Sequence, residues 1–185
     1  MRPREQPVRG ADLGEHAQAH DRHGQPATVR LLASTHSGND NASVEEARDV
    51  AAMVRTLVEV GATWVNQHGE ERLLTYEDVL IVAPYNAQVG AILRELPEGR
   101  VGTVDKFQGQ EAPISIYSMT SSSPEDAPRG MDFLYSRNRL NVATSRARCV
   151  AVVIAEPALL HVRARTPKQM RLANALCQFA ELAGE

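Results

Sequence analysis

Apolar runs of strand length recur along the chain. The run at residues 79–83 is unbroken, and further apolar runs cover residues 114–119 and 149–155. Such runs are typical of central strands in parallel sheets, because those strands are buried on both faces. Shorter strands are expected at residues 27–33 and 101–104. The pattern therefore predicts a mainly parallel β-sheet.

Segments with a helical period separate these strands. Ser43 begins the first, and Glu46 stands three residues later, as in a capping box. Apolar residues follow at spacings of three and four until Gly61, which is expected to end the helix. Residues 87–96 are predicted to be helical as well, and residues 131–147 to be largely helical.

A last helix is predicted to begin with Thr166 as its N-cap and Pro167 in its first position. Residues 64–74 are typical of a small hairpin, and residues 121–130 of a loop. Strands alternate with helices throughout. We therefore expect an α/β fold, with a mainly parallel sheet covered by helices on both faces.

Residues 1–27 are rich in Arg, Gln, His, Gly and Asp and have no apolar period. We expect them to be disordered or the remnant of an upstream segment, so that residues 28–185 form the folded domain. The chain of 185 residues, 43% hydrophobic and 23% charged, has the composition of one ordinary globular domain.

The sequence favours a cytoplasmic location with no membrane partner. The N-terminus contains arginines but no apolar segment typical of a signal peptide. No window reaches the roughly 18 apolar residues that a membrane helix requires. Cys149 and Cys177 are expected to be buried reduced thiols. No Cys-x-x-Cys or Cys/His spacing is present, so no metal site is predicted.

Charge is distributed unevenly. Residues 1–93 contain 8 Lys or Arg and 13 Asp or Glu, whereas residues 94–185 contain 12 and 10. Five arginines and a single acid, Asp132, lie between Arg129 and Arg148. This cluster is the one electrostatic indication of an anionic partner, although a solvated helix face explains it equally well.

Candidate ligand-binding residues follow the predicted strands, where parallel sheets bind ligands. The hydroxyl of Thr103 beside backbone N–H groups is suited to a phosphate. Gly109 permits close backbone approach, and Glu111 is suited to a ribose hydroxyl. Arg139 and Arg146 are two helical turns apart and therefore share a face. Taken singly, each residue also has an ordinary structural explanation, such as a cap, a turn or a salt bridge.

Three sequence motifs together resemble the C-terminal RecA-like domain of superfamily 1 helicases, of the Upf/Nam-like branch. Val82-Ala-Pro-Tyr-Asn-Ala-Gln88 is similar to motif IV of that family. Val101-Gly-Thr-Val-Asp-Lys-Phe-Gln-Gly-Gln-Glu111 is similar to motif V. Arg139-Leu-Asn-Val-Ala-Thr-Ser-Arg-Ala-Arg148 is similar to motif VI, with Ser145 where threonine is commoner. The sequence around these motifs also resembles that of bacterial helicases that are fused to a RecB-like nuclease.

The resemblance implies a nucleotide-binding role for several residues. Arg146 would be the catalytic arginine finger that reaches the ATP γ-phosphate across an interdomain cleft. Glu111, with Gly109, would contact the nucleotide ribose and phosphates, and Arg139 would be a further nucleotide-binding residue.

The resemblance also implies contacts with single-stranded nucleic acid, with DNA expected in preference to RNA. Thr103 would bind a backbone phosphate. Tyr85, Asn86 and Gln88 are further candidates for this interface. Lys106 is either an additional phosphate contact or a solvated lysine.

Half of the expected ATP site is missing from the sequence. There is no Gly-x-x-x-x-Gly-Lys-Ser/Thr phosphate loop, and no Asp-Glu pair follows an apolar strand. In the resembling family both lie on an N-terminal RecA-like domain. The resemblance therefore implies that ATP and Mg²⁺ are held mainly by such a domain, in cis or in trans. The chain alone is not expected to be an ATPase.

Two alternatives remain open from the sequence. The first is a non-catalytic module that keeps the helicase fold and binds nucleic acid or a partner. The second is a flavodoxin-like small-molecule binder, which fits the strand pattern but not the arginine-rich helix.

Overall fold

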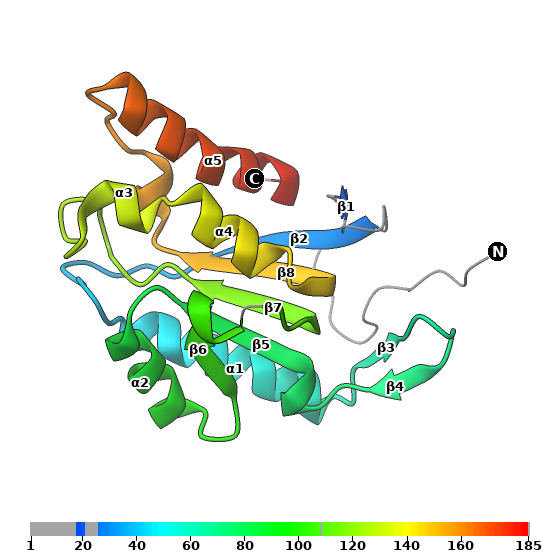
Figure 1. Ribbon diagram of the computed structural model, residues 1–185. Coiled ribbons are helices and arrows are strands. Elements are labelled where there is room, and N and C mark those ends of the chain that lie inside the picture. Colours follow the sequence, from blue (N-terminus) through cyan, green and yellow to red (C-terminus); the bar gives the residue numbers. More distant parts are fainter. Residues whose placement is uncertain (1–17, 21–25, 108, 185) are drawn as a thin grey trace.

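The computed structural model describes residues 18–20, 26–107 and 109–184 (Figure 1). Its main sheet has six strands, and every neighbouring pair except the first is parallel. In spatial order the strands are β1 (Gln18–His20), β2 (Pro26–Ala33), β8 (Ala147–Ala155), β7 (Ala112–Ser118), β5 (Val79–Ala83) and β6 (Arg100–Thr103).

Helices cover both faces of this sheet (Figure 1). On one face lie α1 (Val44–Glu59) and α2 (Asn86–Glu95). On the other lie α3 (Gly130–Leu134), α4 (Arg137–Thr144) and α5 (Pro167–Ala183). Short 3₁₀ segments are η1 (Tyr76–Asp78), η2 (Val104–Phe107) and η3 (Pro157–Leu160). A separate hairpin consists of β3 (Thr63–Val65) and β4 (Glu71–Leu73).

Alternation along the central strands produces two hydrophobic cores. In β5, Val79 and Ile81 pack against α1 and α2, whereas Leu80 and Val82 pack on the opposite face. All five residues of β5 are buried. The period of two in a strand thus explains why a continuous apolar run is needed where both faces are covered. The predicted mainly parallel α/β fold is confirmed.

The structure adds detail to two sequence expectations about secondary structure. Residues 131–147 are largely helical, as predicted, but the helix is divided into α3 and α4, because Ser136 leaves the helical conformation (φ −59°, ψ 113°). The buried Tyr135 hydroxyl donates to the Leu159 carbonyl at 2.8 Å and holds the break in place. Within the stretch expected to lack structure, Gln18–His20 form β1. The remainder of that stretch before β2 lies outside the described residues.

A buried polar cluster lies between α1 and the carboxyl end of β7. Glu46 is fully buried, and its carboxylate accepts hydrogen bonds from His36 Nε2 at 3.0 Å and from Ser118 Oγ at 2.5 Å. The N–H of Thr120 donates to the same carboxylate at 2.9 Å. We call these residues, together with Gln88 and Ser122, the Glu46 cluster.

The Glu46 cluster corrects the expected capping box. Ser43 Oγ does accept a hydrogen bond from the Glu46 N–H, at 3.1 Å, as an N-cap should. The Glu46 side chain, however, is turned into the protein rather than back to Ser43. The Ser43 N–H instead donates to Gln88 Oε1 at 2.7 Å. Sequence spacing alone does not distinguish a capping glutamate from a buried one, because both stand three residues after the cap.

Within the described residues, no helix is long and apolar enough to cross a membrane.

The protonation of the Glu46 cluster is expected to make stability depend on pH. Burial alone lowers the pKa of His36, but its hydrogen bond to Glu46 and the Glu46 charge raise that pKa above the ordinary 6.5. Burial raises the pKa of Glu46 above 4.5, partly offset by its hydrogen bonds. Both groups therefore bind protons more tightly in the folded chain. The free energy of unfolding should therefore fall as pH rises from the ordinary 6.5 of histidine through the raised folded pKa of His36.

Urea denaturation across this pH range measures the effect. Glu46→Gln should flatten the pH dependence and lower stability by about 3–5 kcal/mol, because it removes the negative charge beside His36 and leaves one acceptor oxygen for three buried donors. Asp49→Asn is a matched control on an exposed acid of the same helix. It should leave the pH dependence unchanged. Equal pH profiles for the native chain and Glu46→Gln would contradict the assignment.

Candidate functional site

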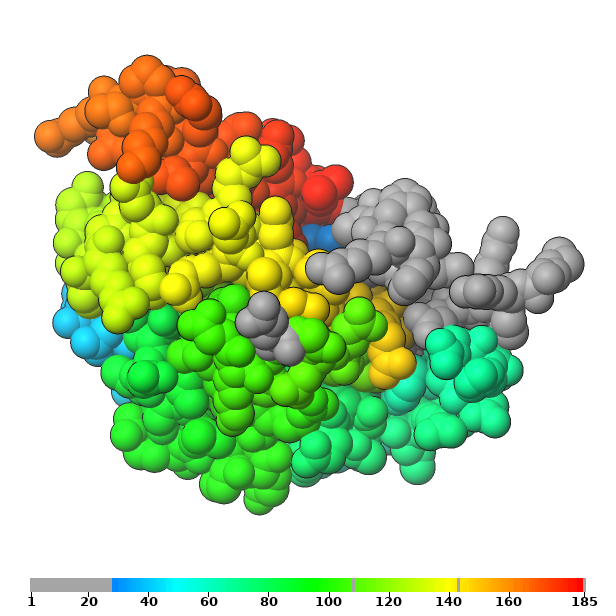
Figure 2. Space-filling model, in the orientation of Figure 1, coloured from blue at the N-terminus to red at the C-terminus, as the bar shows by residue number. Residues whose placement is uncertain are grey.

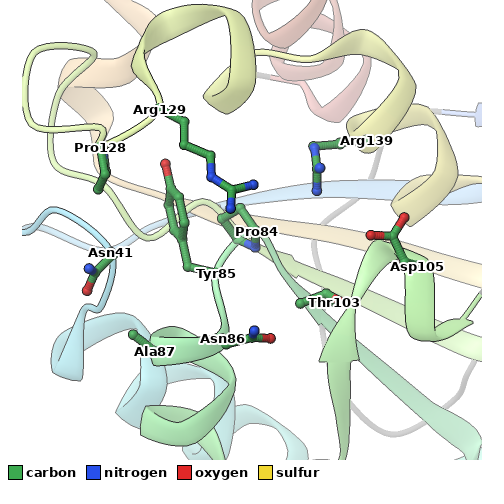
Figure 3. Close-up of a pocket in the computed structure, with 10 residues that line it drawn as sticks. All are labelled: Asn41, Pro84, Tyr85, Asn86, Ala87, Thr103, Asp105, Pro128, Arg129 and Arg139. Carbon is green, nitrogen blue, oxygen red and sulfur yellow. The ribbon is translucent and has the colours of Figure 1, made fainter.

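A cavity of about 420 Å³ opens at the carboxyl ends of β5 and β6 (Figure 3). We call it the strand-end cavity. The loop after β5 and the last residue of β6 form its floor, and the loop before α3 closes its far side. Its lining residues are Asn41, Pro84, Tyr85, Asn86, Ala87, Thr103, Asp105, Pro128, Arg129 and Arg139.

Two arginines enter the strand-end cavity from the α3–α4 side (Figure 3). Their guanidinium carbons lie over the Phe133 ring, at 4.7 Å from its centroid for Arg129 and 4.0 Å for Arg139. Phe133 in turn packs against Tyr85, with ring centroids 5.3 Å apart. Cation–π contacts with one ring restrict both side chains. The cavity thus contains two positioned positive charges and one carboxylate, Asp105.

The opposite wall of the cavity is formed by the start of α2 and the end of β6. Tyr85 is the N-cap of α2 but makes no side-chain capping hydrogen bond. The first-turn N–H groups of a helix favour negative charge through the helix dipole. Asn86 and the half-buried Thr103 add an amide and a hydroxyl beside them. Backbone N–H groups, a hydroxyl and two guanidiniums together are suited to phosphate oxygens.

A second cavity, also about 420 Å³, runs along α4 beside η2. We call it the α4 groove. Arg146 lies at one end and is only 7% exposed. Its Nε atom is buried, and no hydrogen-bond partner for it lies among the described residues. The groove is lined by Val104, Asp105, Ser136, Asn138, Arg139, Val142 and Arg146.

Arg139 and Asp105 line both cavities. Arg139, on α4, therefore stands between the strand-end cavity and the α4 groove. Arg139 and Arg146 line the same groove, although Arg146 lies beyond the end of α4 at Thr144, so the two do not share a helix face as their spacing predicted. Asn141 and Ser145, between them in sequence, are exposed and belong to neither cavity lining.

Thr103 lies at the carboxyl ends of the parallel strands, whereas Glu111 lies at their amino ends. The segment between them begins at the carboxyl end of β6 and reaches the amino end of β7. The Ala112 N–H donates to the Arg146 carbonyl at 3.0 Å, so the backbones of Glu111 and Arg146 lie side by side. Glu111 is exposed and lines neither cavity. The expectation that Thr103 and Glu111 share one strand end is therefore corrected.

Gly109 stands in the turn that leads to β7. Its φ of +80° lies in the left-handed region, which favours glycine. A Cβ atom at this position would meet no atom within 4 Å. The backbone there is thus open to the approach of a ligand. The positive φ by itself is sufficient to explain why this position is a glycine.

The structure removes Gln88 from the candidate nucleic-acid contacts. Its side chain is fully buried, and its amide is occupied on both sides, by the Ser43 N–H at 2.7 Å and by Ser118 Oγ at 2.9 Å. Lys106 is exposed, as expected of a solvated lysine. Its stem folds over Gly102, and its Nζ donates to the Val101 carbonyl at 2.8 Å.

Several cavity residues were not identified from the sequence. Arg129 belongs to the arginine cluster noted there, yet nothing in a loop of Ser and Pro indicated that its side chain turns toward β5. Asn41 comes from a loop 44 residues before Tyr85. Phe133 lies on a short helix, and no sequence pattern indicated that it would contact the cavity arginines. Each depends on how distant loops meet at the sheet edge, which no local pattern reports.

A family model described as AAA domain matches residues 12–158, which is most of the chain. The chain belongs to the AAA domain family. The RecA-like α/β fold of the P-loop NTPase superfamily, expected from the motifs, is thereby confirmed.

Curated relatives of this AAA domain are helicases. Probable RNA helicase armi of Drosophila melanogaster is 37% identical over 99 residues, which is 48% of this chain and 8% of that protein. DNA polymerase alpha-associated DNA helicase A of Schizosaccharomyces pombe is 38% identical over 87 residues, 45% of this chain and 13% of that protein. Uncharacterized ATP-dependent helicase C05C10.2 of Caenorhabditis elegans is 33% identical over 124 residues, 66% of this chain and 7% of that protein. The chain is a helicase-related domain that spans a small part of these relatives.

The burial of Gln88 predicts a structural role that can be separated from binding. Gln88→Ala should lower the free energy of unfolding by about 1–3 kcal/mol, because the Ser43 N–H and the Ser118 hydroxyl lose their partner. Asn86→Ala, on the same helix but in the strand-end cavity, should leave stability within roughly 0.5 kcal/mol. Urea denaturation of both variants provides the measurement. An unchanged free energy of unfolding in Gln88→Ala would show that the buried amide is dispensable.

Proposed function

We propose that this AAA domain is the C-terminal RecA-like half of an ATP-dependent helicase, which contacts single-stranded nucleic acid and supplies an arginine finger. One observation carries the proposal. The positively charged strand-end cavity and the groove that contains Arg146, whose Nε has no hydrogen-bond partner among the described residues, adjoin each other and share Arg139. A helicase requires adjacent sites of this kind, one for a nucleic-acid backbone and one for nucleotide phosphates.

The strand-end cavity is the proposed nucleic-acid site. Thr103, Asn86 and the start of α2 offer donors on one wall, and Arg129 and Arg139 offer charge on the other. These groups recognise phosphate rather than base edges, so binding should be largely independent of sequence. Tyr85 is 8% exposed and packs on Phe133, and we assign it to the cavity wall. The printed names of the relatives include both RNA and DNA helicases, so both polymers belong in the test.

The α4 groove is proposed to form one wall of the nucleotide site. An arginine that is 93% buried normally has its N–H groups paired, and an orphaned Nε is costly. Arg146 therefore stands ready for an acceptor that comes from outside the described chain. ATP with Mg²⁺, when bound, would supply the phosphoryl group to be transferred. Arg146 would stabilise the charge on its oxygens, an effect of about 10³–10⁵-fold in rate for arginine fingers.

The other wall of the nucleotide site is proposed to come from an N-terminal RecA-like domain. The sequence contains no phosphate loop. Glu111 is exposed and its backbone lies beside that of Arg146, and the exposed Gly109 stands two residues earlier, so both are available to a nucleotide held by that second domain. The exposed position of Glu111 is consistent with a role that requires the partner domain.

Replacing Arg129 should weaken binding to oligonucleotides of any sequence. Fluorescence anisotropy with labelled oligo(dT) and oligo(U), from about 50 to 200 mM salt, measures affinity and its salt dependence. Arg129→Gln should lower the affinity and reduce the slope of log K against log salt by about 0.7, the value for one lost phosphate contact on a single strand. Arg94→Gln, an exposed arginine near the end of α2, is the charge-matched control. If both variants bind like the native chain, the strand-end cavity is not a nucleic-acid site.

Hydrolysis of ATP should be absent from the chain by itself. Phosphate release in the presence of ATP, Mg²⁺ and a single-stranded oligonucleotide is expected to equal the buffer rate, in the native chain and in Arg146→Ala alike. The reason is that this chain supplies only one of the two walls of the proposed nucleotide site. A rate well above buffer in the native chain that is lost in Arg146→Ala would overturn this half-site proposal.

A further inference from the structure

The segment between β8 and α5 has an unusual charge pattern. From residue 157 to residue 180 the chain contains four basic residues and no acid. The bases are Arg163, Arg165, Lys168 and Arg171. Most of this segment lies beyond residue 158, where the match to the AAA domain family ends. We define the basic segment as residues 161–171.

Local stability does not explain these charges. Lys168 stands in the first turn of α5, where the helix dipole favours acids, and that turn contains no acid. Lys168 is offset by an ion pair with Asp132 of α3. Arg163 and Arg165 are exposed, and neither forms an ion pair with any residue that the structure describes. The unfavourable position of Lys168 is thus compensated, whereas the charges of Arg163 and Arg165 are not ion-paired with any described residue.

The two arginines line a third cavity, of about 300 Å³, that lies against the loop before α3. Pro124 and Glu125 of this loop contribute to it, together with Met131, Val162 and Gln169. Glu125 is its one carboxylate, so the two guanidiniums dominate the charge. Val162 and Ala164 are half-buried, whereas Arg163 and Arg165 are exposed, so the alternation directs both charges outward.

The same loop connects this cavity to the strand-end cavity. Pro124 and Glu125 line the third cavity, and Pro128 and Arg129, a few residues later, line the strand-end cavity. In Figure 1, the start of α5 lies above α3 at the end of the sheet where β5 and β7 terminate. Figure 2 shows this segment on the surface beside the residues of α3. Arg129 is thus separated from Arg163 and Arg165 by a single loop, which itself contains the acids Glu125 and Asp126.

We propose that the basic segment extends the nucleic-acid site, with Arg163 and Arg165 binding backbone phosphates of a strand that leaves the strand-end cavity past Arg129. The inference rests on the proposed function, since it assigns a longer path to the same ligand. A single strand that spans both places would gain charge contacts without base recognition. An acidic protein segment is the other occupant that this charge would suit, and the experiment separates the two.

The test compares oligonucleotides of two lengths on the full chain. Labelled oligo(dT) and oligo(U) of about 4 and about 16 nucleotides bracket the site sizes of single-strand binding grooves. The double variant Arg163→Gln/Arg165→Gln should bind the longer probes roughly tenfold more weakly, with a salt slope lower by about 1.4, and the shorter probes like the native chain. Arg163→Lys/Arg165→Lys should retain most of the affinity, because it keeps the charge.

Control variants fix the interpretation. Arg72→Gln/Arg94→Gln changes the same charge on exposed residues of β4 and α2 and should not affect either length. Unchanged affinity of the longer probes in the Arg163/Arg165 double variant would overturn the inference and favour an acidic protein partner. An equal loss in the control pair would also overturn it, as a general charge effect. If Arg129→Gln affects neither length, the proposed nucleic-acid site itself fails, whatever the double variant shows.

Discussion

A single buried carboxylate organises the end of the sheet where the candidate site lies. Glu46 is fully buried, and its oxygens accept three hydrogen bonds, one from His36 and two from the segment at the end of β7. An unpaired charge at this depth would cost several kcal/mol, so the surrounding donors must remain in place. Thr120 illustrates the constraint. Its φ of 76° is strained for a β-branched residue, and its N–H is held by Glu46.

The Glu46 cluster also determines where the cavity residues stand. His36 joins the cluster from the loop that carries Asn41, and Ser121 Oγ and the Ser122 N–H bind the carbonyls of Asp40 and Asn39 in that loop. Gln88 ties the start of α2 to Ser118 at the end of β7. The three loops that form much of the strand-end cavity are thus fixed to one another from behind. A rigid support of this kind lets cavity side chains be positioned before a ligand binds.

The sequence predicted the strands well, because strands buried on both faces must be continuously apolar, as β5 is. It failed where a polar residue has two possible partners. Glu46 fits a capping box by spacing but is buried, and Gln88 fits a ligand contact but supports the fold. It also missed the break at Ser136, since Tyr135 is held there by the distant Leu159 carbonyl. The roles of Arg146 and Thr103 came from the resemblance to known motifs, not from spacing or charge.

The break before α4 has a further consequence for the site. It allows α4 to start in a new direction, with Arg139 between the strand-end cavity and the α4 groove. A ligand that draws this guanidinium toward one cavity reduces the positive charge available to the other, because a single charge cannot serve both places fully. Such sharing is reciprocal, so each ligand must alter the affinity for the other by the same factor. The stacking of Arg139 on Phe133 limits how far its side chain moves, and Phe133 therefore influences both cavities without lining either.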